Sequence, residues 1–231
     1  MQRFEELGTF HNVIQPQLDE VFHKDHPLKG RWNSTVFSNN YPIVLELGCG
    51  KGEYTIGLAN QCPAKNFIGL DIKGARMWKG AKYANQNQLQ NVGFLRMRID
   101  HIVSVFARNE VSEIWITFPD PHVNPGRAKK RLTSSIFLSS YQQILKHDGM
   151  IHLKTDNDRL YDYTLRMCEH NRLEIKYHTD DLYHSLRMDP SLAIQTFYES
   201  QFLDKGLTIK YICFKLNSTG SIEEPDDGLM E

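Results

Sequence analysis

The alternation of short apolar runs with helix-like segments constrains the fold of this chain most strongly. Strands are predicted at IVLEL (43–47), FIGLD (67–71), GFLRMRI (93–99), EIWITF (113–118), GMIHLKT (149–155), 173–179 and 208–216. Helices are predicted over 53–61, 73–89, 101–108, 133–146 (with Thr133 as N-cap) and 158–171. Such alternation favours βαβ units, in which a parallel sheet is covered on both faces. The sequence therefore predicts an α/β fold with a doubly wound, mostly parallel, seven-stranded sheet, and its last two strands form a mixed edge.

The predicted domain occupies residues 41–216 and is flanked by two segments of different character. Residues 1–40 have weak periodicity and mixed charge, so we expect an extension with partial helix or strand. The tail 217–231 holds five acidic residues and no basic one, which predicts a disordered, solvated segment. The net charge of −1 becomes +4 once those five carboxylates are set aside. A mildly basic body permits a polyanionic partner without requiring one.

The composition excludes several classes of protein. No run approaches the roughly 18 apolar residues of a membrane span, and the first residues lack the basic-then-apolar layout of a secretory signal. We therefore expect no membrane association and a cytoplasmic location. The four cysteines, Cys49, Cys62, Cys168 and Cys213, are widely spaced, which argues against a disulfide framework or a zinc site. No metal is predicted.

Three glycines at alternate positions follow the strand at 43–47, in VLELGCGKGEYTIGLA. Gly48, Gly50 and Gly52 let the chain turn sharply and approach a ligand closely. A P-loop is excluded because Gly52 follows Gly50-Lys51 and no glycine lies five residues before Gly50. A dinucleotide fingerprint would need a glycine where Glu53 stands, and that carboxylate is a poor match for pyrophosphate.

Acidic residues near this turn favour a ligand that carries a ribose and a positive charge but no phosphate. Asp71 ends the next strand and can accept hydrogen bonds from both hydroxyls of a ribose. Glu46 would lie near the positively charged part of the same ligand. S-adenosylmethionine has these features, and we predict it as the cofactor, with S-adenosylhomocysteine as its product. Asp100, at the end of the third strand, can reach the exocyclic amine of adenine or cap a helix, and the sequence leaves both open. A tight turn with a surface acid is the alternative for the whole motif.

Two further carboxylates follow later strands and predict the substrate side. In TFPDPH (117–122), two prolines restrict the backbone around Asp120. They hold its carboxylate at the rim of the predicted site, where cofactor and substrate would meet. In KTDN (154–157), Asp156 ends the fifth strand at the same rim. A guanine would suit these acids, because its N1–H and exocyclic amine are donors while N7 is an unprotonated lone pair. Methylation of N7 needs alignment and stabilisation of the cationic product rather than a strong base.

Basic residues lie between these acids, in RAKKR (127–131). Beside the substrate rim, Arg127, Lys129, Lys130 and Arg131 predict phosphate binding. Lys73, Arg76, Lys79 and Lys82 recur at three-residue spacing on the predicted 73–89 helix, where a solvated face is the favoured interpretation.

The motifs ELGCGKG, GLDIK, FPDP, KTD and TFYESQF (196–202), in this order, resemble those of the bacterial tRNA (guanine-N7)-methyltransferases over residues 40–216. The resemblance implies a class I, Rossmann-like methyltransferase that modifies guanosine 46 in the variable loop of tRNA, without a metal. It implies cofactor contacts at Glu46, Asp71, Asp100 and Asp120, with Asp120 also catalytic. It implies substrate binding at Asp156, Thr196, Tyr198 and Glu199. From the residues alone, TFYESQF reads as the start of a helix, with Thr196 and Glu199 forming a capping box.

The stretch after Asp120 departs from the family pattern D-P-W-P-K-K-R. Here it reads DPHVNPGRAKKR, so His122 takes the tryptophan position and Asn124 a substrate-binding lysine position, and basic charge returns only at Arg127. One rival function is methylation of an adenine, a cytosine or a protein amide, which would favour N/D-P-P-Y/F in place of PDPH. Another is a non-catalytic RNA-binding subunit, which would be expected to have lost some of the six acids. Either a monomer or a homodimer is compatible with the sequence.

Overall fold

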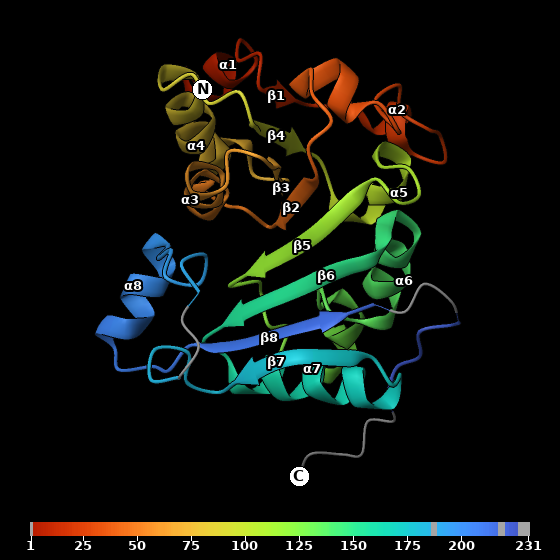
Figure 1. Cartoon of the computed structure of the whole chain (residues 1–231), viewed down its shortest axis with the longest axis vertical. Helices are drawn as coiled ribbons and strands as arrows, with labels where there is room; N and C mark the ends of the chain where they lie inside the picture. The colour runs from red at the N-terminus through yellow and green to blue at the C-terminus, as the bar shows by residue number, and fades with distance from the viewer. Residues whose placement is uncertain (1, 186–188, 217–219, 226–231) are drawn as a thin grey trace.

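The sheet contains eight strands, one more than the sequence predicts. The computed structural model describes residues 2–185, 189–216 and 220–225. Its strands are β1 (Val13–Ile14), β2 (Ile43–Leu47), β3 (Asn66–Asp71), β4 (Val92–Arg96), β5 (Val111–Thr117), β6 (Leu145–Thr155), β7 (Glu174–Thr179) and β8 (Lys210–Lys215). They lie in the order β1-β4-β3-β2-β5-β6-β8-β7, with β8 antiparallel to both of its neighbours and the other pairs parallel (Figure 1). The α/β class, the mostly parallel sheet and the mixed edge are confirmed.

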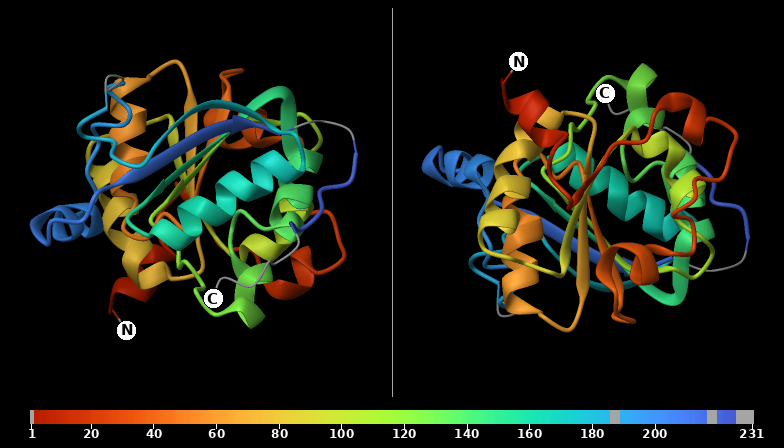
Figure 2. Two further views of the ribbon diagram at one scale, coloured as in Figure 1. Left: turned by 90° about the horizontal axis from the view of Figure 1, so that it is seen from below. Right: turned by 90° about the horizontal axis from the view of Figure 1, so that it is seen from above.

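Helices cover both faces of the sheet. They are α1 (Gln2–Leu7), α2 (Leu18–Val21), α3 (Glu53–Gln61), α4 (Gly74–Gln86), α5 (Ile102–Val105), α6 (Ser135–Ile144), α7 (Asp158–His170) and α8 (Phe197–Asp204). A short π-helix (Asn33–Phe37) and two 3₁₀ segments (Ile99–His101 and Pro125–Lys130) complete the set. The two views of Figure 2 place α3 and α4 on one face and α5, α6 and α7 on the other.

Alternating residues of the central strands enter two separate hydrophobic cores, as the pleat of a strand requires. Leu45 and Leu47 of β2 join the core beneath α5, α6 and α7. Val44 joins the core beneath α3 and α4, together with Phe94 of β4. Because both faces of these strands are buried, the strands read as solid apolar runs, and for this reason the sequence identifies them well.

The N-terminal extension, for which the sequence predicts partial helix or strand, supplies the eighth strand of the sheet. Val13 and Ile14 of β1 pair in parallel with Phe94 and Leu95 of β4 at the sheet edge. Further along, the Trp32 ring stacks on Phe106 with 5.1 Å between centroids. A two-residue strand offers no periodicity to detect, so the sequence predicts seven strands where eight occur.

Part of the acidic tail packs on the domain. Residues 220–225 contact α6 and α7, and Ile222 packs against the core beneath them. The prediction of a disordered, solvated tail therefore does not hold for residues 220–225. Residues 217–219 and 226–231, which the same prediction covers, lie outside the described residues. The N-cap of α6 is Ser134, not Thr133 as predicted. Thr133 is buried, and its hydroxyl forms a 2.9 Å hydrogen bond with that of Thr164.

Among the described residues, no helix combines the length and apolar character that crossing a membrane requires.

Candidate active site

The glycine turn between β2 and α3 adopts a backbone that L side chains rarely adopt. Gly48, Gly50 and Gly52 have φ angles of 75°, 55° and 73°. A Cβ on Gly52 would lie 2.6 Å from Cε1 of Phe94, whereas one on Gly48 would meet nothing within 4 Å. Gly52 is thus needed for packing beneath the turn, and Gly48 borders open space. The turn joins the end of β3, because the N–H of Gly48 donates to the carbonyl of Leu70 at 2.8 Å.

Glu46 lies buried beneath this turn, with 3% of its surface exposed. Its carboxylate accepts hydrogen bonds from the Thr55 N–H at 2.8 Å, from the Thr55 hydroxyl, and from the Thr117 hydroxyl at 2.7 Å. Burial raises the pKa of Glu46 to about 7, although these three donors act in the opposite direction. A cation bound beside Glu46 would favour the ionised carboxylate.

Asp71 shares a cavity with Glu46 at the carboxyl edge of the sheet. One oxygen of Asp71 accepts from the Gly50 N–H at 2.9 Å and the other from the Lys73 N–H at 2.8 Å. Each carboxylate oxygen has two lone pairs, so both can still accept from a ligand. This cavity measures about 80 Å³, and besides Glu46 and Asp71 its lining includes Gly48, Gly50, Lys51, Arg76, Thr117, Phe118, Thr196 and Tyr198.

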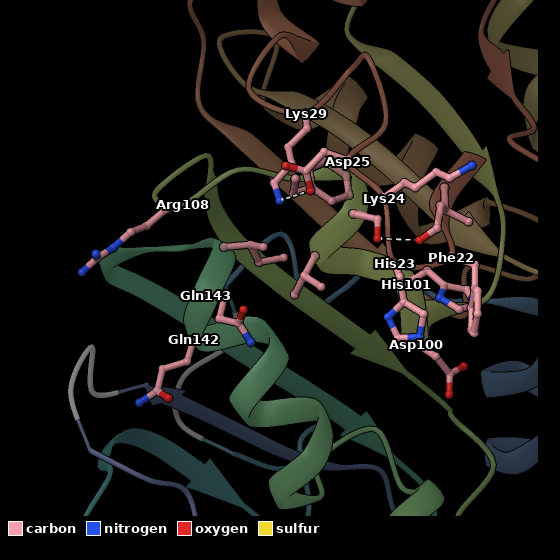
Figure 3. Close-up of a pocket in the computed structure, with 15 residues that line it drawn as sticks. Phe22, His23, Lys24, Asp25, Lys29, Asp100, His101, Arg108, Gln142 and Gln143 are labelled. Carbon is pink, nitrogen blue, oxygen red and sulfur yellow. Dashed lines mark hydrogen bonds and ion pairs between the residues drawn. The ribbon is translucent and has the colours of Figure 1, made fainter. Parts of the chain in front are cut away.

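Asp100 lies apart from this cavity. Its carboxylate pairs with the Arg98 guanidinium at 3.2 Å, and it stands at one end of a second, larger groove (Figure 3). This groove measures about 1170 Å³ and runs between residues 21–29, α5 and α6. Its lining combines the half-exposed Phe22 with charged side chains, including Lys24 and Arg108. The structure therefore does not bring Asp100 into one cavity with Glu46 and Asp71.

The loop after β5 presents Asp120 to solvent, with 74% of its side chain exposed. The flanking residues Phe118 and His122 have φ angles of 49° and 40°, a strained conformation for residues other than glycine that costs about 1–3 kcal/mol each. Asp120 accepts the His122 N–H at 3.1 Å. The sequence anticipates a stiff loop from its prolines, and the structure places the strain on the two residues around them.

Asp156 directly follows β6, and the basic run is joined to the Asp120 loop through Arg131, which donates to the carbonyls of Pro121 and His122. Asp156 is half-buried at the end of β6, and burial raises the pKa of its carboxyl group. Arg127, Lys129 and Lys130 are exposed around the 3₁₀ segment Pro125–Lys130, which begins where the Asn124 side chain accepts the Gly126 N–H at 2.9 Å. Arg131 differs from them, because only 8% of its surface is exposed.

Helix α8 begins beside the glycine turn, and the arrowheads of β5 and β6 point toward it (Figure 1). The Phe197 N–H donates to Glu53 at 2.8 Å, and the Lys51 ammonium lies 3.4 Å from the centre of the Phe197 ring. Glu53, whose carboxylate argues against a pyrophosphate site, therefore binds the N-terminus of α8. Thr196 and Glu199 form the predicted capping box, which is confirmed.

Glu199 faces the protein interior rather than the cavity. Its carboxylate pairs with the Lys154 ammonium at 2.8 Å, and neither side chain is exposed to solvent. The Tyr183 hydroxyl donates to the same carboxylate at 2.9 Å. Thr196 and Tyr198, by contrast, line the cavity. The structure thus separates the residues that the TFYESQF motif groups together.

Comparison with known proteins gives a consistent result. A family model described as a putative methyltransferase matches residues 40–212. The tRNA (guanine-N(7)-)-methyltransferase of Porphyromonas gingivalis is 52% identical over 228 residues, covering 98% of this chain and 91% of that protein. Those of Christiangramia forsetii and Bacteroides thetaiotaomicron are 51% and 48% identical, over 94% and 98% of this chain and 97% and 89% of their own lengths.

This chain belongs to the tRNA (guanine-N7)-methyltransferase family. Among solved structures, the 16S rRNA methyltransferase KamB resembles it with a TM-score of 0.61 at 13% identity, covering 80% of this chain and 92% of that one. At that identity the likeness concerns the fold alone.

Several residues of the candidate site are not singled out by the sequence. Thr55 and Thr117 are the hydroxyl donors to Glu46, and Lys154 is the buried partner of Glu199. Arg76, which the sequence assigns to a solvated helix face, lines the cavity with Tyr198. Lys154 in the strand GMIHLKT is one signal in the sequence, because a lysine at a buried strand position needs a partner.

Proposed function

We propose that this chain transfers the methyl group of S-adenosylmethionine to N7 of a guanosine in tRNA, at the position 46 that the motif resemblance implies. The observation that carries the proposal is a cavity in which the carboxylates of Glu46 and Asp71 meet at the carboxyl ends of β2 and β3. The same chain exposes the cations Arg127, Lys129 and Lys130 after the Asp120 loop. A phosphate-free, positively charged ligand suits the first feature, and an RNA backbone suits the second.

The residues present fit S-adenosylmethionine on two observations. Glu46 is a buried carboxylate that a cation would stabilise in its charged form, and Asp71 keeps lone pairs for ribose hydroxyls. The cavity of about 80 Å³ is below the roughly 300–1,000 Å³ of typical ligand cavities, so much of the ligand would lie along the open rim beside the exposed Ile72. When bound, S-adenosylmethionine supplies a methyl group on a sulfonium, and its transfer to N7 forms a C–N bond while the electron pair of the broken C–S bond remains with sulfur.

The chain's own residues orient the guanine and stabilise positive charge. N7 has a lone pair and loses no proton, so the site needs no strong base. The Asp120 carboxylate, held at the rim by its strained loop, would stabilise the cationic 7-methylguanosine that forms. Asp156 would accept from the guanine N–H groups. Arg127, Lys129 and Lys130 would contact phosphates.

The decisive experiment identifies the methylated nucleoside. Protein, unmodified tRNA and methyl-labelled donor are incubated together, and the RNA is then digested to nucleosides. We expect label in 7-methylguanosine. Label in an adenosine or cytidine would favour the rival nucleobase enzyme, and tRNA binding without any transfer would favour a non-catalytic subunit.

Asp120→Asn tests the catalytic assignment. Loss of the carboxylate should lower kcat about 100-fold or more, the effect typical of one lost electrostatic group. Asp162→Asn, which alters an exposed aspartate of α7, is the matched control and should be near wild type. Comparable turnover in both variants would remove Asp120 from the mechanism.

The basic run is tested by changing Arg127, Lys129 and Lys130 together to Gln while keeping Arg131. The slope of log K against log salt for tRNA binding is negative, and its magnitude should fall by up to about 3. This is near 1 for each phosphate that the protein no longer neutralises. Lys146→Gln, at the start of β6, is the exposed control. An unchanged slope in the triple variant would assign the run to a solvated loop.

A further inference from the structure

Arg131 is the one cation of the RAKKR run that points into the protein. Its Nε donates to the carbonyl of Pro121 at 3.3 Å, and its Nη2 donates to the carbonyl of His122 at 3.2 Å. These two carbonyls belong to the residues that directly follow Asp120. Arg131 therefore bonds to the loop that carries the proposed catalytic carboxylate.

Tyr163 of α7 supports Arg131 from the other side. The guanidinium carbon of Arg131 lies 4.3 Å from the centre of the Tyr163 ring, an arrangement that suits a planar cation. Tyr163 is 1% exposed, so its hydroxyl requires a hydrogen-bond partner inside the protein. The partner is Glu224, to which the hydroxyl donates at 2.7 Å.

Glu224 comes from the C-terminal segment, 61 residues away from Tyr163 in the chain. Its second oxygen accepts the Ser135 N–H at 2.9 Å, at the start of α6, where a carboxylate is favoured by the helix dipole. The segment is fixed by its backbone as well. The N–H and carbonyl of Glu223 both bond to the side chain of Asn171 at 2.8 Å.

We propose that the C-terminal segment 220–225 holds the Asp120 loop in its productive shape, through Glu224, Tyr163 and Arg131. The loop needs such support because Phe118 and His122 adopt left-handed backbone conformations that relax when unsupported. Arg131 is thus a positioning residue and not a phosphate contact. This inference rests on the proposed function only in taking Asp120 as the group that is positioned.

The test compares Glu224→Ala with Glu223→Ala, two neighbouring changes that alter net charge equally. In the second variant the backbone bonds to Asn171 remain, and the side chain that is removed bonds only to Ser221 among the described residues. Glu224→Ala should lower kcat roughly tenfold, the order expected when a charge-assisted hydrogen bond no longer supports the loop. KM for tRNA and the salt slope of binding should stay unchanged, and Glu223→Ala should match wild type.

Hydrogen exchange gives a readout that does not depend on activity. Residues 118–124 should exchange faster in Glu224→Ala and in Tyr163→Phe than in Glu223→Ala. If the wild-type protein methylates no tRNA, the proposed function fails, yet this exchange difference still tests the support. Equal exchange and equal kcat in the two alanine variants would overturn the inference.

Arg131→Lys distinguishes positioning from phosphate binding. The variant keeps the positive charge but loses the planar guanidinium that donates to the carbonyls of both Pro121 and His122. We expect a lower kcat with an unchanged salt slope. An unchanged kcat with a weaker, less salt-dependent binding of tRNA would show that Arg131 contacts phosphate and would overturn the inference.

Discussion

Replacement of Lys154 by methionine tests the buried ion pair that attaches α8 to the sheet. Lys154 and Glu199 are both 0% exposed, and their charged atoms lie 2.8 Å apart. The Lys154 ammonium also donates to the carbonyls of Leu192 and Ile194, at 3.0 Å and 3.2 Å. Lys154 thus holds the backbone that leads into Thr196 and Tyr198 at the cavity.

The expected loss is large because the variant leaves a buried carboxylate without its cation. Breaking a buried pair from one side costs about 3–5 kcal/mol in the free energy of unfolding. At roughly 2–4 °C per kcal/mol for a chain of this size, the midpoint of thermal unfolding should fall by about 6–20 °C. Urea and thermal unfolding followed by circular dichroism measure both quantities.

Two further variants decide whether the ion pair is the cause. Lys29→Met removes the cation of the Lys29–Asp25 pair, whose side chains are 29% and 72% exposed, and it should cost less than about 1 kcal/mol. The double variant Lys154→Met/Glu199→Leu removes both buried charges. It should recover part of the loss, although it also forfeits the capping box, worth about 1 kcal/mol. A Lys154→Met variant as stable as Lys29→Met would refute the reasoning.

Two remaining predictions concern the glycine turn. Because burial raises the pKa of Glu46 to about 7 from an ordinary value of 4.5, the folded protein binds an extra proton between these values, and stability from this group falls as pH rises from about 4.5 to 7. The free energy of unfolding of Glu46→Gln minus that of the wild type should therefore rise by about 3 kcal/mol between pH 4.5 and pH 8, as measured by urea unfolding. The same difference at both pH values would contradict this prediction. Gly52→Ala should lower the free energy of unfolding by several kcal/mol, because the added Cβ would collide with Phe94. Gly48→Ala should cost only about 1 kcal/mol from its positive φ, and its main effect should be weaker cofactor binding in calorimetry. Similar losses of stability in the two variants would show that packing does not distinguish these positions.

The amino-acid sequence by itself determines the seven longer strands, the glycine turn and the capping box. Strand β2 and helix α3 begin and end at the predicted residues, since an apolar run and a helical period are local properties. The Thr196–Glu199 capping box is local as well, with its partners three residues apart. The early end of the predicted 73–89 helix, at Gln86, reflects fraying and capping at boundaries that a pattern does not fix.

Only the tertiary structure decides what each charged side chain does. Arg131 follows Lys130 directly in the sequence, yet it is buried against the Asp120 loop while Lys130 is exposed. Lys154 meets Glu199 only because the fold brings the segment before α8 to its ammonium, which also donates to the carbonyls of Leu192 and Ile194. Glu224 reaches Ser135 across 89 residues. The physical reason is that local patterns record backbone period and burial, whereas the partner of a charge depends on which distant segments the completed fold places within a few ångströms.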